Sequence, residues 1–219
     1  MTIKGDIEVV WRKVALIQRF SSVLYPFDIF ELLTQLPTIG YVVPELSLTV
    51  AREANRPIAQ KGDTELAINQ DNKTIGVVGR KVEKTIELFK ELQKFYSERM
   101  DPSSGLETQY IELDAEGWAK SGNSPISSFT SFWSEYKPLE ELGQILGDDT
   151  VNFGVNLVPA NKDPNSAEYF HITITPLIPS ATKRYQFRFI KRGADLQQML
   201  DRFSKTEDTL RKIIGKIEV

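Results

Sequence analysis

Residues 64–100 (TELAINQDNKTIGVVGRKVEKTIELFKELQKFYSERM) contain the change of pattern that decides the fold. Apolar and polar residues alternate at 66–68 and again at 75–77, on either side of a polar turn at 70–73, which predicts a β-hairpin. From residue 81 to residue 100, apolar residues recur every three or four positions between Lys and Glu residues, which predicts a long amphipathic helix. A hairpin followed by such a helix predicts an antiparallel sheet covered by helices.

The sequence before the hairpin contains further elements of both kinds. Residues 7–24 are rich in β-branched and aromatic side chains and predict one long strand or two strands in line. Residues 27–36 predict a short helix that starts near Asp28. Leu46, Leu48 and Val50 alternate with polar residues, which predicts a half-buried strand. Residues 54–63 are interpreted as a polar loop.

The sequence after residue 105 repeats the order strand, helix, several strands and long helix. The repeat concerns the order and length of the elements and not the identity of the residues. It is predicted to contain strands at 106–113, 151–157, 170–174 and 185–189, a helical region at 125–146 broken near Pro138, and a helical region at 194–217.

The predicted fold class is therefore α+β, with two similar halves that form an antiparallel sheet with helices packed on one face. The halves, residues 1–100 and 106–219, are joined by a linker at 101–105, where Asp, Pro, Ser and Gly stop the helix. They form either two domains or one fused, pseudo-symmetric domain. The layout resembles the two-repeat saddle of the TATA-binding protein by analogy of element order alone, and a shared layout does not confer a function.

Composition excludes several classes of site. The chain has 219 residues, 41% of them hydrophobic, with a net charge of −3 and no cysteine. The absence of cysteine excludes a thiol nucleophile, thiolate metal sites and disulfides, and we expect no cofactor. The acidic balance argues against nucleic-acid binding through phosphate contacts. Without a signal sequence or an apolar run of roughly 20 residues, we expect no membrane partner and a cytoplasmic location.

The sole histidine, His171, lies in a stretch of alternating polar and apolar residues. Its polar neighbours share one face of the predicted sheet, opposite the face that the helices cover. This face is either a shallow binding surface, on which His171 can act as an acid or a base, or a solvated or subunit-contact face. The candidate ligand-binding residues are Tyr169, His171, Thr173, Asn152, Asn156, Arg184 and Arg188.

Two predicted strand-to-helix junctions place a glycine beside a basic pair. The N-terminus of a helix offers free amides and a partial positive charge, so either pair can complete an anion site. Neither matches a phosphate-binding motif in spacing, and a tight turn kept soluble by lysine is the alternative. The candidate anion-binding residues are Gly79, Arg80 and Lys81 in the first half and Lys191, Arg192 and Gly193 in the second.

Three acidic residues, Glu112, Asp114 and Glu116, alternate along one predicted strand and therefore share a face. Carboxylates in a row can bind a hard cation, but they more often form a charged edge that discourages unwanted strand pairing. No second acidic cluster accompanies them, and no metal site is predicted.

Four aromatic residues, Phe129, Phe132, Trp133 and Tyr136, share one face if their segment is helical. Packing in the core is the first interpretation of such a stripe. Any part of the stripe that is exposed would instead anchor a partner, because protein interfaces are enriched in these side chains.

Since no spacing matches a catalytic motif, a non-enzymatic role is favoured. The leading hypothesis is a binding or assembly protein that acts through protein–protein contacts, as a homodimer or with another protein. The second hypothesis is a small-molecule or anion-binding protein, or a minor enzyme, with a pocket near His171 between the sheet and the helices. His171, Arg184 and Arg188 would be its polar contacts. Nucleic-acid binding through the polar sheet face is the third hypothesis.

Overall fold

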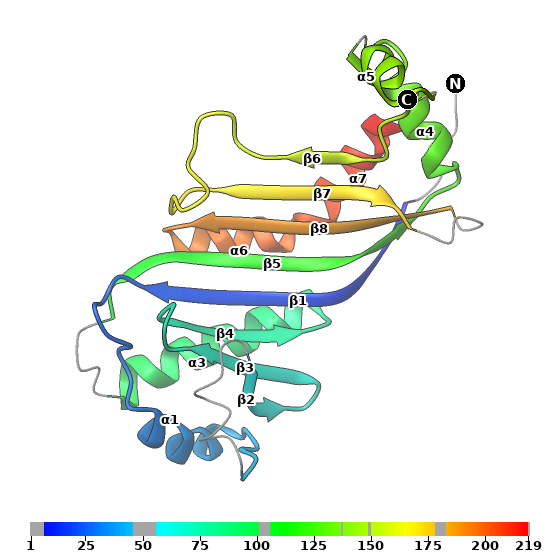
Figure 1. The fold of residues 1–219 in the computed structure, drawn as a ribbon. Helices are drawn as coiled ribbons and strands as arrows, with labels where there is room; N and C mark the ends of the chain where they lie inside the picture. The colour runs from blue at the N-terminus through cyan, green and yellow to red at the C-terminus, as the bar shows by residue number, and fades with distance from the viewer. Residues whose placement is uncertain are drawn as a thin grey trace.

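The computed structural model describes residues 7–45, 56–100, 106–136, 138–148, 150–177 and 183–218. Within these ranges the protein is of the mixed α+β class, with six α-helices and one eight-stranded antiparallel sheet (Figure 1). The strands are β1 (Glu8–Phe20), β2 (Arg56–Lys61), β3 (Thr64–Asn69), β4 (Thr74–Gly79), β5 (Thr108–Lys120), β6 (Val155–Leu157), β7 (Phe170–Pro176) and β8 (Arg184–Gly193). The helices are α1 (Ile29–Gln35), α3 (Val82–Arg99), α4 (Pro125–Phe132), α5 (Pro138–Leu146), α6 (Leu196–Ser204) and α7 (Thr206–Ile217), and a 3-10 turn (Leu36–Ile39) follows α1.

The two longest strands, β1 and β5, pair at the centre of the sheet. The strand order is β2-β3-β4-β1-β5-β8-β7-β6, so β1 and β5 each carry three further strands on their outer side. Their antiparallel register runs from Glu8 opposite Lys120 to Phe20 opposite Thr108. This single long pairing joins the strands that precede residue 100 to those that follow residue 105.

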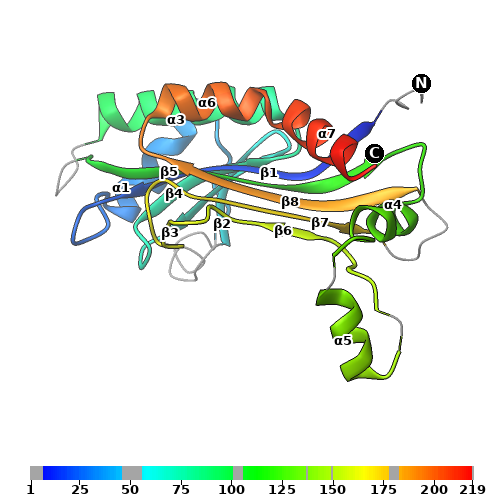
Figure 2. The same ribbon diagram turned by 90° about the horizontal axis from the view of Figure 1, so that it is seen from above.

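Helices α3, α6 and α7 lie along one face of the sheet (Figure 2). Alternation along β1 places Val14, Leu16 and Phe20 in the core, and all three are buried. The helices meet them with buried apolar stripes, such as Leu88, Phe89 and Leu92 on α3 and Leu210, Ile214 and Ile217 on α7. Each buried side chain of this kind contributes about 1.5–3 kcal/mol, so this face holds most of the hydrophobic stabilisation.

One polar side chain in this core, Gln18, links α3 to both central strands. Its Oε1 accepts hydrogen bonds from the Tyr96 hydroxyl and, at 3.0 Å, from Gln93 Nε2. Its Nε2 donates to Thr108 Oγ1 at 2.7 Å. A buried amide is tolerated here because its donor and acceptor groups both have partners.

Several sequence predictions are confirmed. The hairpin is β3–β4, the long amphipathic helix is α3, and the polar and apolar residues of β7 and β8 separate onto opposite faces. Asp28 is the N-cap of α1, where its Oδ1 accepts a hydrogen bond from the Glu31 amide at 2.9 Å. The helical region predicted to break near Pro138 is the pair α4 and α5.

Two of the predicted boundaries are wrong. The predicted polar loop at 54–63 contains the edge strand β2, whose alternation is hidden by Pro57 and by a bulge between Pro57 and Ala59. The strand predicted at 106–113 continues to Lys120. Its second part lacks a series of large apolar residues, because the buried positions are occupied by the small residues Ala115, Gly117 and Ala119.

The strand predicted at 151–157 is also shorter than expected. Regular pairing is confined to β6, at Val155–Leu157, while Val151 and Phe153 lie exposed before it. The strand predicted from Leu46 to Val50 and the linker at 101–105 lie outside the described residues.

Candidate functional site

The sheet face opposite α3, α6 and α7, here called the open face, carries ion pairs across its centre. Strand β5 pairs with β1 on one side and with β8 on the other. Asp114 on β5 therefore lies between Lys13 on β1 and Arg188 on β8. Its Oδ2 accepts a hydrogen bond from Lys13 Nζ at 2.8 Å, and its two oxygens accept from Arg188 at 3.1 and 3.3 Å. The Asp114 side chain is only 8% exposed, so the two cations enclose the carboxylate.

The charge state of Asp114 follows from these contacts. Burial by itself would raise the pKa of the carboxyl, but the hydrogen bonds and charges of Arg188 and Lys13 outweigh it and hold the pKa below its ordinary value. Hydrogen bonding to Asp114 correspondingly raises the pKa of Arg188. Asp114 is therefore ionised at neutral pH, where it links β5 to β1 and β8 and is not a proton donor.

A second ion pair joins Glu112 on β5 to Arg192 on β8 through Arg192 Nε. The same guanidinium donates from Nη1 to the Pro164 carbonyl at 2.6 Å and lies over the Tyr110 ring, 4.8 Å from its centroid. Arg192 thus fixes the loop before β7 to the sheet, and its charge is already matched by a carboxylate.

The row of three carboxylates does not converge on one point. Glu112 and Asp114 face different basic partners, and Glu116 contributes to the electrostatic environment of Arg188. In the part of the chain that the structure describes, no group of three His, Asp or Glu side chains is placed to hold a metal ion.

His171 lies on the open face of β7, beside the edge strand β6. Its Nε2 is 2.6 Å from Asn156 Oδ1, and Thr173 Oγ1 lies 3.4 Å from the same nitrogen. Because the amide oxygen is an acceptor, Nε2 carries the proton in this pairing. These three predicted residues are brought together, and His171 is held by an amide and not by a carboxylate that would activate it.

The other predicted ligand contacts are dispersed. Arg184 lies on the open face over Trp118, 4.2 Å from the ring centroid, and Arg188 is bound to Asp114. Tyr169 lies before β7, 5.8 Å from the Arg192 guanidinium. Asn152 lies outside the sheet, where its Oδ1 accepts from the Gly154 amide at 3.1 Å. His171, Arg184 and Arg188 all face away from α3, α6 and α7, so they line no space between the sheet and these helices.

The two glycine-and-base junctions differ from each other. At the start of α3, Arg80 and Lys81 are exposed, and a Cβ on Gly79 would lie 2.9 Å from Thr85 Oγ1. At the start of α6, Arg192 is paired with Glu112 and Lys191 lies on the opposite sheet face.

At the second junction, backbone amides at the start of α6 donate hydrogen bonds to carboxylates of the same chain. Glu168 Oε1 accepts from the Ala194 amide at 3.3 Å, and the N-cap Asp195 accepts from the Gln198 amide at 2.6 Å. Internal carboxylates therefore occupy the second candidate anion site.

A depression of about 930 Å³ lies on the open face over β1 to β5. Its floor is made of small residues, among them the fully buried Ala15 and Gly76, where a Cβ would lie 2.8 Å from the Leu16 carbonyl oxygen. Arg12 and Arg80 line it together with Asp63 and Glu65. Of the predicted site residues, its described lining contains Arg188 and the candidate anion-binding residues Gly79 and Arg80. Sequence reasoning missed this depression because its floor is apolar and lies across strands that are distant in sequence.

Exposed apolar side chains gather at the other end of the molecule. Residues 126–158, here called the apolar arm, comprise α4, α5, the segment after α5, and β6 with Val158. The arm holds ten of the fourteen large hydrophobic side chains that are exposed among the described residues. These ten are Ile126, Phe132, Tyr136, Leu142, Ile145, Leu146, Val151, Phe153, Leu157 and Val158.

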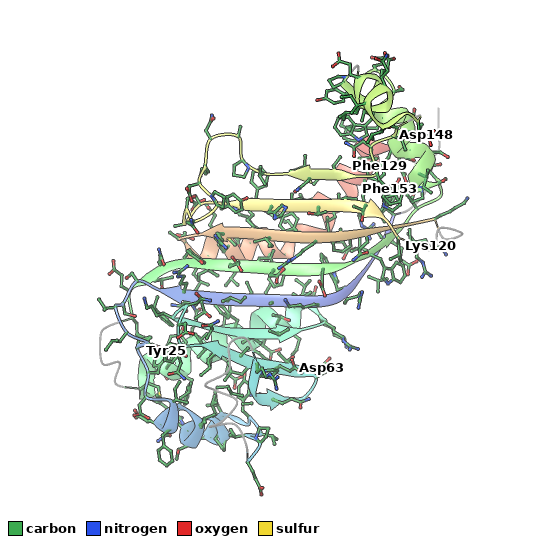
Figure 3. All side chains as sticks on the ribbon, in the orientation of Figure 1. Tyr25, Asp63, Lys120, Phe129, Asp148 and Phe153 are labelled. Atoms are coloured by element: carbon green, nitrogen blue, oxygen red, sulfur yellow. The ribbon has the colours of Figure 1, made fainter. Side chains whose placement is uncertain are left out.

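Helix α5 is the most exposed element of the apolar arm. It projects from the sheet on the side away from α3, α6 and α7 (Figure 2), and none of its residues is buried. Ile145 is 79% exposed and Leu146 70%. Asp148 and Phe153 lie at this end of the molecule, whereas Asp63 lies near the other edge of the sheet, between β2 and β3 (Figure 3).

The aromatic stripe of α4 divides between the core and the surface. Phe129 is buried and packs against Tyr185 with ring centroids 5.9 Å apart, whereas Phe132 and Tyr136 are about half exposed. Trp133 lies between Phe132 and Tyr136, with centroid distances of 5.1 and 5.5 Å, and its buried Nε1 has no acceptor among the described residues. The exposed part of the stripe belongs to the same surface as α5.

The sequence matches no model of a known protein family, and no curated protein is similar to it. Among the described helices, none has the length and apolar character needed to cross a membrane.

We expect Asp114→Asn to lower the free energy of unfolding by about 1–2 kcal/mol at neutral pH, since hydrogen bonds to charged groups contribute about 1.5–3 kcal/mol and the exposure of Lys13 and Arg188 reduces this. The folded state lowers the pKa of Asp114, so its contribution is present above the ordinary value of 3.8 and is lost as the pH falls below it.

Urea unfolding of both proteins from pH 7 downward tests this expectation. The difference should narrow only below about pH 4, as the lowered pKa requires. Glu98→Gln, at an exposed position of α3 far from Asp114 in the sequence and without an ion pair among the described residues, is the control and should change stability little. A difference between wild type and Asp114→Asn that stays constant into acid would contradict the pairing.

Proposed function

We propose that this chain is a non-enzymatic binding or assembly protein that acts through protein–protein contacts at its apolar arm. The observation that carries the proposal is the gathering of ten exposed large hydrophobic side chains within residues 126–158. Exposed apolar surface is unfavourable in water, and a contiguous patch of it marks an interaction site in soluble proteins. Phe132 and Tyr136 supply aromatic anchors of the kind that dominate interface energetics.

The polar groups of the open face also support binding over catalysis. Asp114 and Glu112 are neutralised by neighbouring cations, and His171 is hydrogen-bonded to an amide. General acid–base catalysis needs a group that is free to take up or release a proton within hydrogen-bond reach of the reacting atoms. The charges of β1, β5 and β8 instead serve to hold the strands together.

We further propose that the chain consists of two similar halves in a pseudo-symmetric arrangement, laid out like the saddle of the TATA-binding protein. The element order supports this, because β1 is followed by a helix, three strands and the long helix α3, and β5 by helices, three strands and α6–α7. Strand order supports it as well, since β1-β4-β3-β2 on one side corresponds to β5-β8-β7-β6 on the other. Helices α4 and α5 then correspond in element order to α1 of the first half.

A photo-crosslinking amino acid in place of Ile145 tests the protein-contact function in cells. We expect a crosslinked product of higher mass from this position, because the side chain is 79% exposed on the proposed contact surface. The matched control replaces Val23, which is 86% exposed but lies outside the apolar arm, and should give no product.

The mass of the product separates a second copy of the chain from a different protein. The absence of a product from Ile145, or equal products from Ile145 and Val23, would refute the proposed contact surface.

A small-molecule binding function at the open-face depression is a second candidate. Its volume of about 930 Å³ is within the range of ligand pockets, roughly 300–1,000 Å³, and its apolar floor is rimmed by charges of both signs. We expect a compound from a thermal-shift screen of metabolites to raise Tm, and Ala67→Leu to abolish the rise by filling the floor. A flat response across the screen would count against this candidate.

A further inference from the structure

The apolar arm contains a cleft between the C-terminal part of α4 and α5. The cleft has a volume of about 820 Å³, and its described lining includes Trp133, Tyr136, Leu139 and Val151. The turn after α5 is fixed by backbone hydrogen bonds, because the Gly143 carbonyl accepts from the Gly147 amide at 2.8 Å and from the Asp148 amide at 3.2 Å. The groove combines its aromatic and aliphatic side chains with polar ones, among them Thr130, Ser134, Gln144 and Asn152.

The described residues that line this groove include the acidic Glu140 and Asp148 and no Lys or Arg. Helix α5 begins with the exposed carboxylates Glu140 and Glu141, and Lys137, which precedes α5, lies outside the described residues. Complementary charge at an interface raises the rate of encounter and selects the partner. An occupant of the groove is therefore expected to carry positive charge beside its apolar side chains.

A helix fits this surface better than an added strand. The adjacent edge strand β6 has three residues and lies between Gly154 and Pro159, so it offers a very short ladder for strand addition. An amphipathic helix instead inserts side chains spaced three and four residues apart into an apolar groove.

A second copy of the chain has no suitable helix to offer among its described residues. The apolar side chains of α3, α6 and α7 are already buried against the sheet, and two copies of α5 would bring acidic residues together. Within the described helices, α5 alone buries none of its residues.

We propose that the apolar arm binds a basic amphipathic helix of another protein, with apolar side chains in the cleft beside α5 and Lys or Arg residues facing Glu140 and Glu141. This inference rests on the proposed protein-contact function and adds the chemistry of the partner.

Fluorescence anisotropy with synthetic peptides of about 18 residues, or five helical turns, tests the inference on the full chain. The first peptide contains Leu at helical spacing with Lys elsewhere, the second has the same composition in scrambled order, and the third has Glu in place of Lys. We expect the first to bind about tenfold more tightly than either of the others, and its affinity to fall as salt is raised. Equal affinities, or no binding of the first peptide, would overturn the inference.

Variants of the chain separate the contributions of charge and shape. We expect Glu140→Lys combined with Glu141→Lys to weaken binding of the Leu/Lys peptide about tenfold, and the corresponding pair of Gln substitutions to weaken it less. The control Glu98→Lys reverses an exposed charge near the end of α3, outside the apolar arm, and should leave the affinity unchanged. Undiminished binding by the double Lys variant, with its fold confirmed by circular dichroism, contradicts the assigned contact.

The outcomes distinguish the two proposals. A crosslink from Ile145 to a different protein, without selective binding of the Leu/Lys peptide, leaves the protein-contact function standing and refutes the basic helix. A crosslink from Ile145 to a second copy of the chain does the same. The absence of any crosslink at Ile145 removes the proposed function, and the basic helix with it.

Discussion

The antiparallel pairing of β1 with β5 is the constraint on which the rest of the structure depends. Strand residues alternate between faces, so a slip of one residue in this register would move Leu113 to the open face and bring Asp114 beneath the helices. Close packing helps to hold the register, because a Cβ on Gly117 would lie 2.1 Å from the Val10 carbonyl oxygen. The same register places Lys13 and Arg188 opposite Glu116, so that both side chains reach Asp114, two residues earlier on β5, diagonally across the open face.

This arrangement leaves the two faces of the sheet in different states. One face is covered by helices and buries the apolar core, while the other neutralises its charges through pairs between neighbouring strands. The apolar arm differs from both faces, because α5 projects from the sheet without burying any of its residues. Folding buries the apolar residues and pairs charged residues of the central sheet but leaves the apolar arm exposed. This is why we propose that the arm contacts another molecule.

The sequence was sufficient to predict the elements whose residues repeat with a clear period. The hairpin β3–β4, the helix α3 and the N-cap at Asp28 follow from local pattern and capping chemistry. Strands β2 and β5 were harder to predict, because a bulge in one and small residues in the other replace the expected apolar alternation. Register across the sheet is a long-range property, so the partners of Asp114 and Glu112 could not be read from the chain.

The candidate site was predicted only in part for the same reason. Local alternation was enough to place His171, Thr173 and Arg188 on one polar face, but it could not show which charges that face neutralises. The apolar arm does leave a signal in the sequence, namely a run of 24 residues, 138–161, that has four acidic residues and no Lys or Arg. Whether such a helix packs on its own protein depends on tertiary structure.

Hydrogen–deuterium exchange of the purified chain at low concentration tests most directly whether the apolar arm is unpartnered in the isolated protein. Amides of β1 and β5 should exchange slowest, those of α3 slowly, and those of α5 far faster than any helix packed on the sheet, because exposed helices open locally at small cost. Protection of α5 equal to that of α3 would show that the arm packs on its own chain and would contradict this account.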